Sequence, residues 1–470
     1  MGSKWKQTTL GDLALGFDGA VDGPFGSNLP ASAYTESGYP IIRGSNLSIG
    51  LDDFKDSDFV FVPEHIFQKL SRSECRAGDI IFTKKGTLGQ TGLISARHRF
   101  EKYLLSSNQM RLRVDPEKAL PEYVYYYVSS QKAINKLIQD SECTGVPKIN
   151  LAYLKSFPIS LPSLSGQKEI IYILGSLNRK IILNRQINQT LEQMSQTLFK
   201  SWFVDFDPVI DNALDAGNPI PETLQSRSAL RQKVRNSADF KPLPADIRTL
   251  FPAEFEETEL GWVPRDWYYV PLKNLGKIIC GKTPDKSNKE YYGKDYLFIK
   301  IPDMHGKVFV TNSTDKLSTL GSETQIKKLI PKGSICVSCI ATVGIVAINS
   351  KDCHTNQQIN SIVPNSSILR NYLYFSMLEK NKTFHDLASG GSATLNMNTG
   401  IFSNVLTLKP EDSVLERFQQ TSEHWFGRIL ANENEIHTLT ALRDTLLPKL
   451  ISGELSLEDL PDLVTQTEPA

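Results

Sequence analysis

The sequence predicts a mixed α+β protein built from two tandemly repeated globular domains and two long helices. Three observations lead to this fold class. Strand-like and turn-like motifs recur in the same order roughly 250 residues apart, and each half is followed by a stretch with apolar residues at heptad spacing. The 470 residues are 40% hydrophobic and 22% charged, which is the ordinary composition of a globular chain.

The internal repeat is clearest around two turn glycines. Residues 78–83 and 333–338, 255 positions apart, both read as a turn glycine followed by a short apolar strand that leads into a small-residue hairpin. Further matches have offsets of 246 to 249, a drift that insertions and deletions in surface loops produce. They pair 107–109 with 355–357, 123–126 with 372–375, and 145–150 with 391–396. We interpret the two halves as copies of one fold.

Two stretches, near 167–202 and 415–450, carry heptad patterns that predict long helices. An asparagine at a core position of such a seam can fix the register of two helices. The alternative is that each helix packs only on its own domain. Thirty-six helical residues would span about 54 Å, a useful length for a spacer. The residues expected to pack are Leu177, Asn184, Ile187, Leu191, Met194 and Leu198 in the first helix, and Asn432, Leu439, Leu442 and Leu446 in the second.

The neutral net charge of the chain hides a strongly uneven distribution. The predicted segments are a first domain at 1–164, a first spacer helix at 165–205, an acidic proline-rich connector at 206–262, a second domain at 263–410, a second spacer helix at 411–453 and an acidic tail at 454–470. Charge sums for nearly the same segments give the second domain +8 and the first about +2, whereas the connector carries −4 and the C-terminal 60 residues −8. The neutral sum therefore does not exclude a nucleic-acid partner.

The six cysteines and the lack of an apolar signal or membrane segment predict a cytoplasmic protein. Residues 276–283 match the phosphate-loop spacing, but Pro284 follows at once and no suitable strand precedes them, so we expect no nucleotide site. Cys336, Cys339 and Cys353 suggest zinc only weakly, and buried reduced thiols are the favoured interpretation. With no histidine motif and no methyltransferase motif either, we predict neither a catalytic site nor a metal site in this chain.

Binding residues are better represented than catalytic ones. Basic and amide side chains follow the strand ends and hairpins of both halves, where they could contact phosphates and base edges of DNA. Taken singly, each could instead be a solvated surface residue or an amide that caps a strand. The candidates are Arg43, Asn46, Lys84, Lys85, Thr87 and Gln109 in the first half, and Lys282, Thr283, Lys300, Thr342 and Gln357 in the second.

Several motifs together resemble the specificity subunit of type I restriction–modification systems, over nearly the whole chain. The connector at 206–262 is the least alike, and the second half has Ala341 where the first has Gly86. The motifs are Gly-Pro-Phe-Gly-Ser-Asn at 23–28, Pro-Ile-Ile-Arg-Gly at 40–44, Gly-Asp-Ile-Ile at 78–81, Ser-Trp-Phe-Val-Asp-Phe-Asp-Pro at 201–208, Gly-Lys-Thr-Pro at 281–284 and Leu-Arg-Asp-Thr-Leu-Leu-Pro-Lys-Leu-Ile-Ser-Gly-Glu-Leu at 442–455.

The resemblance implies that each domain reads one half of a split, asymmetric DNA target, and that the two helices run antiparallel as a spacer. It also implies partners: double-stranded DNA, two modification subunits that methylate adenine with S-adenosylmethionine, and restriction subunits that use ATP and Mg²⁺. On this view the chain itself binds no cofactor and is no enzyme. The other readings are a coiled-coil interaction scaffold without DNA readout and a self-sufficient enzyme.

Overall fold

The computed structural model describes residues 5–52, 54–141, 146–389 and 395–455. The chain divides into two compact units. Unit 1 is discontinuous and contains residues 1–183 and 436–470, whereas unit 2 is the continuous stretch 184–435. Most of the expected acidic tail, and parts of the matched segments 145–150 and 391–396, lie outside the described residues.

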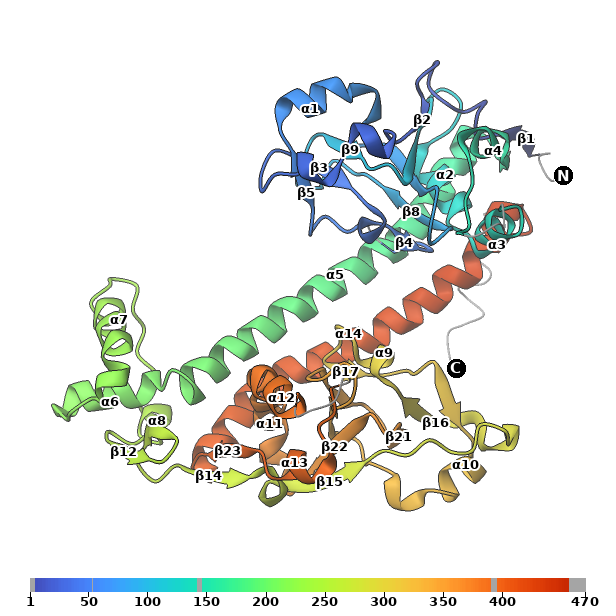
Figure 1. Ribbon diagram of the computed structural model, residues 1–470. Helices are drawn as coiled ribbons and strands as arrows, with labels where there is room; N and C mark the ends of the chain where they lie inside the picture. The colour runs from blue at the N-terminus through green and yellow to red at the C-terminus, as the bar shows by residue number, and fades with distance from the viewer. Residues whose placement is uncertain (1–4, 53, 142–145, 390–394, 456–470) are drawn as a thin grey trace. The chain divides into compact units, whose positions relative to one another are not determined.

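Unit 1 is built on a five-stranded sheet with the order β2-β10-β7-β8-β4. Figure 1 labels three of these strands, β2, β8 and β4. A second sheet of four strands has the order β5-β3-β9-β6, and β1 pairs with β11. The strands are β1 Lys6–Thr9, β2 Ala20–Asp22, β3 Tyr39–Ile42, β4 Ser48–Ile49, β5 Val60–Val62, β6 Glu74–Cys75, β7 Asp79–Thr83, β8 Gln90–Leu93, β9 Tyr103–Leu105, β10 Gln109–Arg113 and β11 Pro158–Leu161. The short helices are α1 Glu64–Lys69, α2 Pro121–Val128, α3 Gln131–Gln139 and α4 Leu151–Ser156.

Unit 2 repeats this plan. Its five-stranded sheet has the order β15-β22-β19-β20-β17, a three-stranded sheet has the order β18-β16-β21, and β14 pairs with β23. The strands are β14 Tyr268–Pro271, β15 Gly276–Cys280, β16 Tyr292–Ile299, β17 Phe309–Val310, β18 Asp315–Leu317, β19 Ile335–Ser338, β20 Val346–Asn349, β21 Cys353–Thr355, β22 Ile359–Pro364 and β23 Leu406–Lys409. The helices are α9 Ile301–Met304, α10 Thr319–Glu323, α11 Arg370–Glu379, α12 Asn381–Ala388 and α13 Thr399–Ser403. The predicted α+β duplication is thereby confirmed.

Backbone hydrogen bonds fix which residues of the two copies correspond. The amide of Lys84 donates to Asn108 O, and that of Cys339 donates to Gln358 O, both over 2.8 Å. Asn108 therefore corresponds to Gln358, whereas the sequence match had paired it with Asn356. The helix caps give a second correction, because Asn150 caps α4 and Asn398 caps α13, so Asn150 corresponds to Asn398 and not to Asn396. Both sequence alignments were two residues out, since short polar motifs tolerate a shift that strand register does not.

The segment expected as a connector, 206–262, is folded and packed. It forms α6 Asp207–Ala216, α7 Gln225–Arg235, α8 Ala245–Arg248 and the hairpin of β12 Phe255–Thr258 with β13 Gly261–Pro264. Three aspartates one turn apart on α6 face three arginines one turn apart on α7. The pairs are Asp207 with Arg227, Asp211 with Arg231 and Asp215 with Arg235. The acidic charge of this segment is thus partly neutralised within the segment.

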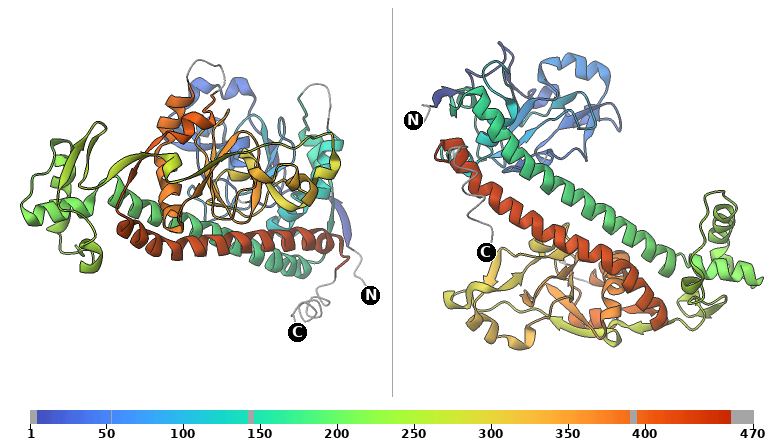
Figure 2. Two further views of the ribbon diagram at one scale, coloured as in Figure 1. Left: turned by 90° about the horizontal axis from the view of Figure 1, so that it is seen from below. Right: turned by 180° about the vertical axis from the view of Figure 1, so that it is seen from behind.

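Two long helices, α5 Leu164–Phe203 and α14 Asp412–Ser452, appear as single unbroken ribbons in Figure 2. In unit 2 they run antiparallel, because Asn184 Nδ2 donates to Glu435 over 2.8 Å while Asn432 Nδ2 donates to Asn188 Oδ1 over 2.8 Å. Both also pack on the domain core, which contains Phe199 and Phe418. Within the described residues, no helix is both long and apolar enough to cross a membrane.

The predicted helix seam has two rows of residues. The row through Asn184 and Asn432 is buried or half-buried as expected, whereas the row through Met194 and Leu442 is displaced by one residue. Asn184 and Asn432 are buried and Leu191 and Leu198 pack on the core, while Leu177, Ile187, Leu439 and Leu446 are half-buried. Met194 and Leu442, both 45% exposed, do not belong to the seam. The second row instead passes through polar residues that are buried, namely Asn188, Ser195 and Arg443. The heptad pattern selected the apolar residues that directly precede these buried polar ones.

Candidate nucleic-acid interface

One end of the five-stranded sheet of unit 1 gathers several loops that carry polar and basic side chains. Gly23 follows β2 and its amide donates to Gln109 O over 2.9 Å. A Cβ atom at Gly23 would lie 1.9 Å from Ser106 O, so only glycine allows this close approach. Beside it, Lys84 follows β7 and pairs with Asp22 over 3.1 Å. These contacts hold the loops after β2 and β7 together at the same end of the sheet, which we call the sheet edge.

The equivalent edge of unit 2 is assembled by the same contacts. Gly281 donates its amide to Ile359 O over 3.1 Å, and a Cβ atom there would lie 2.2 Å from Asn356 O. Lys282 N donates to Thr355 O over 2.9 Å, and Thr283 Oγ1 donates to Gln357 Oε1 over 2.6 Å. The side chains of Lys282 and Gln357 are exposed. The structure therefore brings Gln357 next to Lys282 and Thr283, although Gln357 is far from them in the sequence.

A hairpin next to this edge is also duplicated. Gly86 N donates to Pro147 O, and Ala341 N donates to Leu395 O, so Gly86 and Ala341 correspond. Both have positive φ angles, of 107° and 66°. Thr87 and Thr342 then occupy matching exposed positions, and Lys85 is exposed beside them. Unit 2 has Ala341 where unit 1 has Gly86, and the hairpin still forms. Alanine can adopt the left-handed conformation, although this costs conformational free energy.

Arg43 and Lys300 are equivalent residues at the start of a matching loop in each unit. The backbone amide of Arg43 donates to Asn46 Oδ1, and that of Lys300 donates to Asp303 Oδ2, both over 2.9 Å. The Arg43 guanidinium donates to Asp58 O, whereas the Lys300 ammonium pairs with Asp315 and lies 5.5 Å from the ring centre of Phe298. Both side chains are half-buried.

Two predicted contact residues, Asn46 and Gln109, have buried side chains that form hydrogen bonds within the protein. Asn46 is 1% exposed, and its amide donates to Lys55 O and Ser57 O while its oxygen accepts from Arg43 N. Gln109 is equally buried and accepts a hydrogen bond from Ser106. These hydrogen bonds favour the alternative interpretation, in which a polar side chain at a strand end caps the strand.

One residue at the interface was missed. Phe25 is 81% exposed in the loop that Gly23 anchors. Its sequence signal was the run Gly-Pro-Phe-Gly, which surrounds an aromatic residue with turn formers.

The sequence motifs that resemble a nucleotide site and a zinc site have structural explanations. Gly276–Cys280 is the strand β15, and Lys282 and Thr283 follow it in a loop, so they do not open a phosphate-binding helix. Cys336 and Cys339 are buried, and burial raises the pKa of these thiols to about 12 and about 11. Among the described residues, no group of three or more His, Cys, Asp or Glu side chains is arranged to hold a metal ion.

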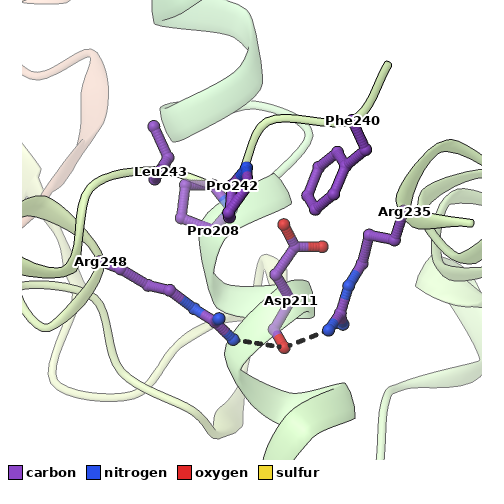
Figure 3. A pocket seen from close by; sticks show the side chains of 7 residues that line it. All are labelled: Pro208, Asp211, Arg235, Phe240, Pro242, Leu243 and Arg248. Atoms are coloured by element: carbon purple, nitrogen blue, oxygen red, sulfur yellow. Dashed lines mark hydrogen bonds between the residues drawn. The ribbon is translucent and has the colours of Figure 1, made fainter. Parts of the chain in front are cut away.

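A cavity of about 250 Å³ lies among α6, α7 and α8 (Figure 3). Its two arginines, Arg235 and Arg248, donate to Asp211 O and also pair with Asp215. The remaining lining residues are Pro208, Phe240, Pro242 and Leu243. Because both guanidinium groups already have carboxylate partners, this cavity offers no unpaired charge to a ligand.

Comparisons with known proteins agree with this architecture. The family described as type I restriction modification DNA specificity domain matches residues 24–193 and 264–406. The chain is 37% identical to the type I restriction enzyme HindI specificity subunit of Haemophilus influenzae, over 96% of this chain and 100% of the relative. It is 30% identical to the MjaIX specificity subunit of Methanocaldococcus jannaschii, over 82% of this chain and 79% of the relative.

A solved structure shows the same fold. The crystal structure of the type I restriction-modification system S subunit from M. genitalium has a TM-score of 0.52 and 13% sequence identity, and the match covers 95% of this chain and 96% of that one. Together with the duplicated family match, these similarities confirm the resemblance seen in the sequence. The chain belongs to the type I restriction–modification specificity subunits, a family that supplies DNA sequence specificity and not catalysis.

Proposed function

We propose that the chain reads a bipartite, asymmetric DNA target, one half with each unit. The observation that carries this proposal is that one loop-bearing sheet edge is built twice with the same backbone contacts and different exposed side chains. An asymmetric target needs this combination, because the two edges must approach DNA alike but recognise different bases. The recognition domains are 1–164 and 263–410.

Lys84, Lys85 and Lys282 provide the phosphate contacts in this proposal, and Thr87, Thr283, Thr342 and Gln357 contact base edges or sugars. Arg43 and Lys300 have acceptors within the loops they begin, so they stiffen the edge and reach DNA only with the distal parts of their side chains. The larger basic excess of 263–410 gives the second domain the stronger grip on the backbone.

The long helices, proposed at 165–205 and 411–453, set the number of unread bases between the half-sites and carry two modification subunits. The folded segment 206–262 connects the first helix to the second domain. S-adenosylmethionine, ATP and Mg²⁺ act on the modification and restriction subunits, in a cytoplasmic complex. The paired helices support a spacer role, since the hydrogen bonds between Asn188, Asn432 and Glu433 fix their register.

The decisive experiment maps N6-methyladenine in cells that contain this chain and its modification subunit. We expect a single gapped motif that disappears when the gene is deleted, and an unchanged methylome would refute the proposal. Inserting residues into both helices should change the gap length and leave the half-sites intact. A band-shift series with the assembled complex should show affinity that falls steeply with salt, unlike a scaffold without DNA readout.

A further inference from the structure

The loop after the first edge strand places different side chains on one shared backbone position in the two units. Gly23 and Gly281 correspond because each donates its amide to the first residue of the second strand of its sheet, β10 or β22. A Cβ atom at either glycine would clash with backbone there. Counting two residues onward from these glycines, Phe25 in unit 1 corresponds to Thr283 in unit 2. The anchors hold both residues at the same point of the sheet edge.

The chemistry at this position differs completely. The Phe25 ring is 81% exposed. Thr283 donates instead to Gln357, and the residue that corresponds to Gln357 in unit 1 is Ser107. Unit 2 therefore presents an organised hydroxyl–amide pair at the point where unit 1 presents an aromatic ring.

The Phe25 ring is held outward by ordered backbone. Asn28 N donates to Phe25 O over 2.8 Å, which closes a short turn, and the chain before it is fixed by Gly23. Packing such a ring away from water would stabilise a protein, but this loop leaves the ring exposed. Single exposed apolar residues are common on protein surfaces, so exposure alone decides nothing. At Phe25, exposure coincides with an anchored backbone and with a position that unit 2 fills with hydrogen-bonding groups.

We propose that Phe25 and Thr283 occupy the specificity-determining position of the two units. Phe25 reads its half-site by apolar contact with a base, and the Thr283–Gln357 pair reads the other half-site by hydrogen bonds to base edges. This inference rests on the proposed bipartite reading of DNA and assigns residues to it. It also explains how a weakly charged first domain obtains sequence-dependent contact.

The test uses the full chain assembled with its modification subunits, and the readout is the methylated motif at each base position. Phe25→Ala should relax or lose one or more positions in a single half-site, with discrimination there falling about tenfold, the equivalent of about 1.4 kcal/mol. Thr283→Val, which removes the hydroxyl and keeps the shape, should relax positions only in the other half-site. Phe25→Leu should retain part of the discrimination, because it preserves an apolar contact.

Phe17 provides a matched control. It is 89% exposed in unit 1, but it lies in the turn at the opposite end of β2, where Arg113 N donates to Gly19 O. Phe17→Ala should leave the motif and the methylation rate unchanged. Thermal unfolding of each variant, measured alongside, should match the parent, because neither aromatic ring is packed.

The outcomes separate this inference from the proposed function. If the parent complex produces no gapped motif, the bipartite reading itself fails. If the parent produces one but Phe25→Ala methylates the same motif at the same rate, only the assignment of Phe25 fails. Equal loss at both half-sites would also overturn it, because a specificity position must act on one.

Discussion

The central sheets of the two units have the same strand order but opposite interior chemistry. In unit 1, Asp79 is fully buried and accepts from Arg113 through both carboxylate oxygens, over 2.7 and 2.8 Å, while the buried Arg111 donates to backbone carbonyls. The corresponding residues of unit 2 are Ser334, Val363 and Ser361. One backbone thus accommodates a charged interior network or an almost uncharged one.

This difference teaches that register, more than side-chain identity, defines the repeat. Gly78 and Gly333 make the same backbone bond before the central strand, to Ile94 O and to Asn349 O. The residue after each glycine closes the same small turn. Once these bonds are set, the interior is free to diverge between copies. Arg111 and Arg113 both count toward the charge of the first domain, but their guanidinium groups form hydrogen bonds within the unit.

The largest expected effect comes from breaking the interior network of unit 1. Asp79→Ala leaves the Arg113 guanidinium without its carboxylate, and losing one partner of a buried ion pair costs about 3–5 kcal/mol. Ser334→Ala at the corresponding position of unit 2 removes one hydrogen bond and should cost about 1 kcal/mol. Hydrogen exchange of the β7 and β19 amides measures each change separately. Equal losses at the two sites would show that the charged network adds nothing specific to unit 1.

The pH effect of one buried histidine should be confined to unit 2. His354 is fully buried there, whereas the corresponding residue of unit 1 is Leu104, and burial lowers the pKa of the imidazole from 6.5 to about 4. The unfolded chain therefore binds a proton that the folded unit rejects, so stability is lost as the pH falls from about 6.5 to about 4. The loss should reach about 2–3 kcal/mol.

His354→Leu should remove this part of the pH dependence, while the loss of the Ser322 hydrogen bond adds only a constant offset. Tryptophan fluorescence during urea unfolding suits the measurement, because four of the five tryptophans lie in unit 2. An identical pH slope in the parent and the variant would exclude His354 as its source.

A smaller contrast concerns the helix seam. Asn432→Ala leaves the buried Asn188 Oδ1 without its donor and should lower the free energy of unfolding of unit 2 by about 2 kcal/mol. Asn178 plays a similar part in unit 1, where it accepts from Arg443 Nη1 over 3.0 Å. Because Arg443 also donates to Asp444 and Leu51, Asn178→Ala should cost only about 1 kcal/mol. Urea unfolding of both variants tests this order, and a larger cost at Asn178 would reverse it.

The smallest effect should have opposite signs in the two hairpins. Gly86→Ala places a Cβ atom on a backbone with φ of 107° and should destabilise unit 1 by about 1 kcal/mol. No atom lies within 4 Å of that Cβ position, so the cost is conformational and not a clash. Ala341→Gly relieves the same strain in unit 2 and should stabilise it by up to about 1 kcal/mol. Shifts of the melting temperature in the same direction would contradict the equivalence of the hairpins.

Much of the fold was predictable, because duplication and heptad spacing survive in the sequence as patterns. The seam positions that the sequence did not predict have a common cause. Asn188, Ser195 and Arg443 are polar residues inside a seam, and hydrophobicity assigns such positions to the surface. Hydrogen bonds across the helix pair make Asn188 and Arg443 tolerable, and those bonds depend on partners that are distant in the sequence.

The candidate interface could be predicted in part, for similar reasons. Strand ends and glycines located Lys84, Lys282 and Thr283 at the edges. Asn46 and Gln109 carry the same type of side chain as Gln357, and only burial distinguishes the structural amides from the exposed one. Phe25 was missed because an apolar residue gives no sign of exposure until its loop is placed.

The discontinuity of unit 1 has a consequence for biosynthesis. Its core includes Leu447, Leu450 and Ile451, which are made after the whole of unit 2. On the ribosome, the uninterrupted stretch 184–435 can complete its fold while 1–183 still lacks the segment that covers its apolar residues. The unit whose synthesis begins first is therefore completed last. In the meantime its exposed core is the part of the nascent chain with the greatest need for chaperones.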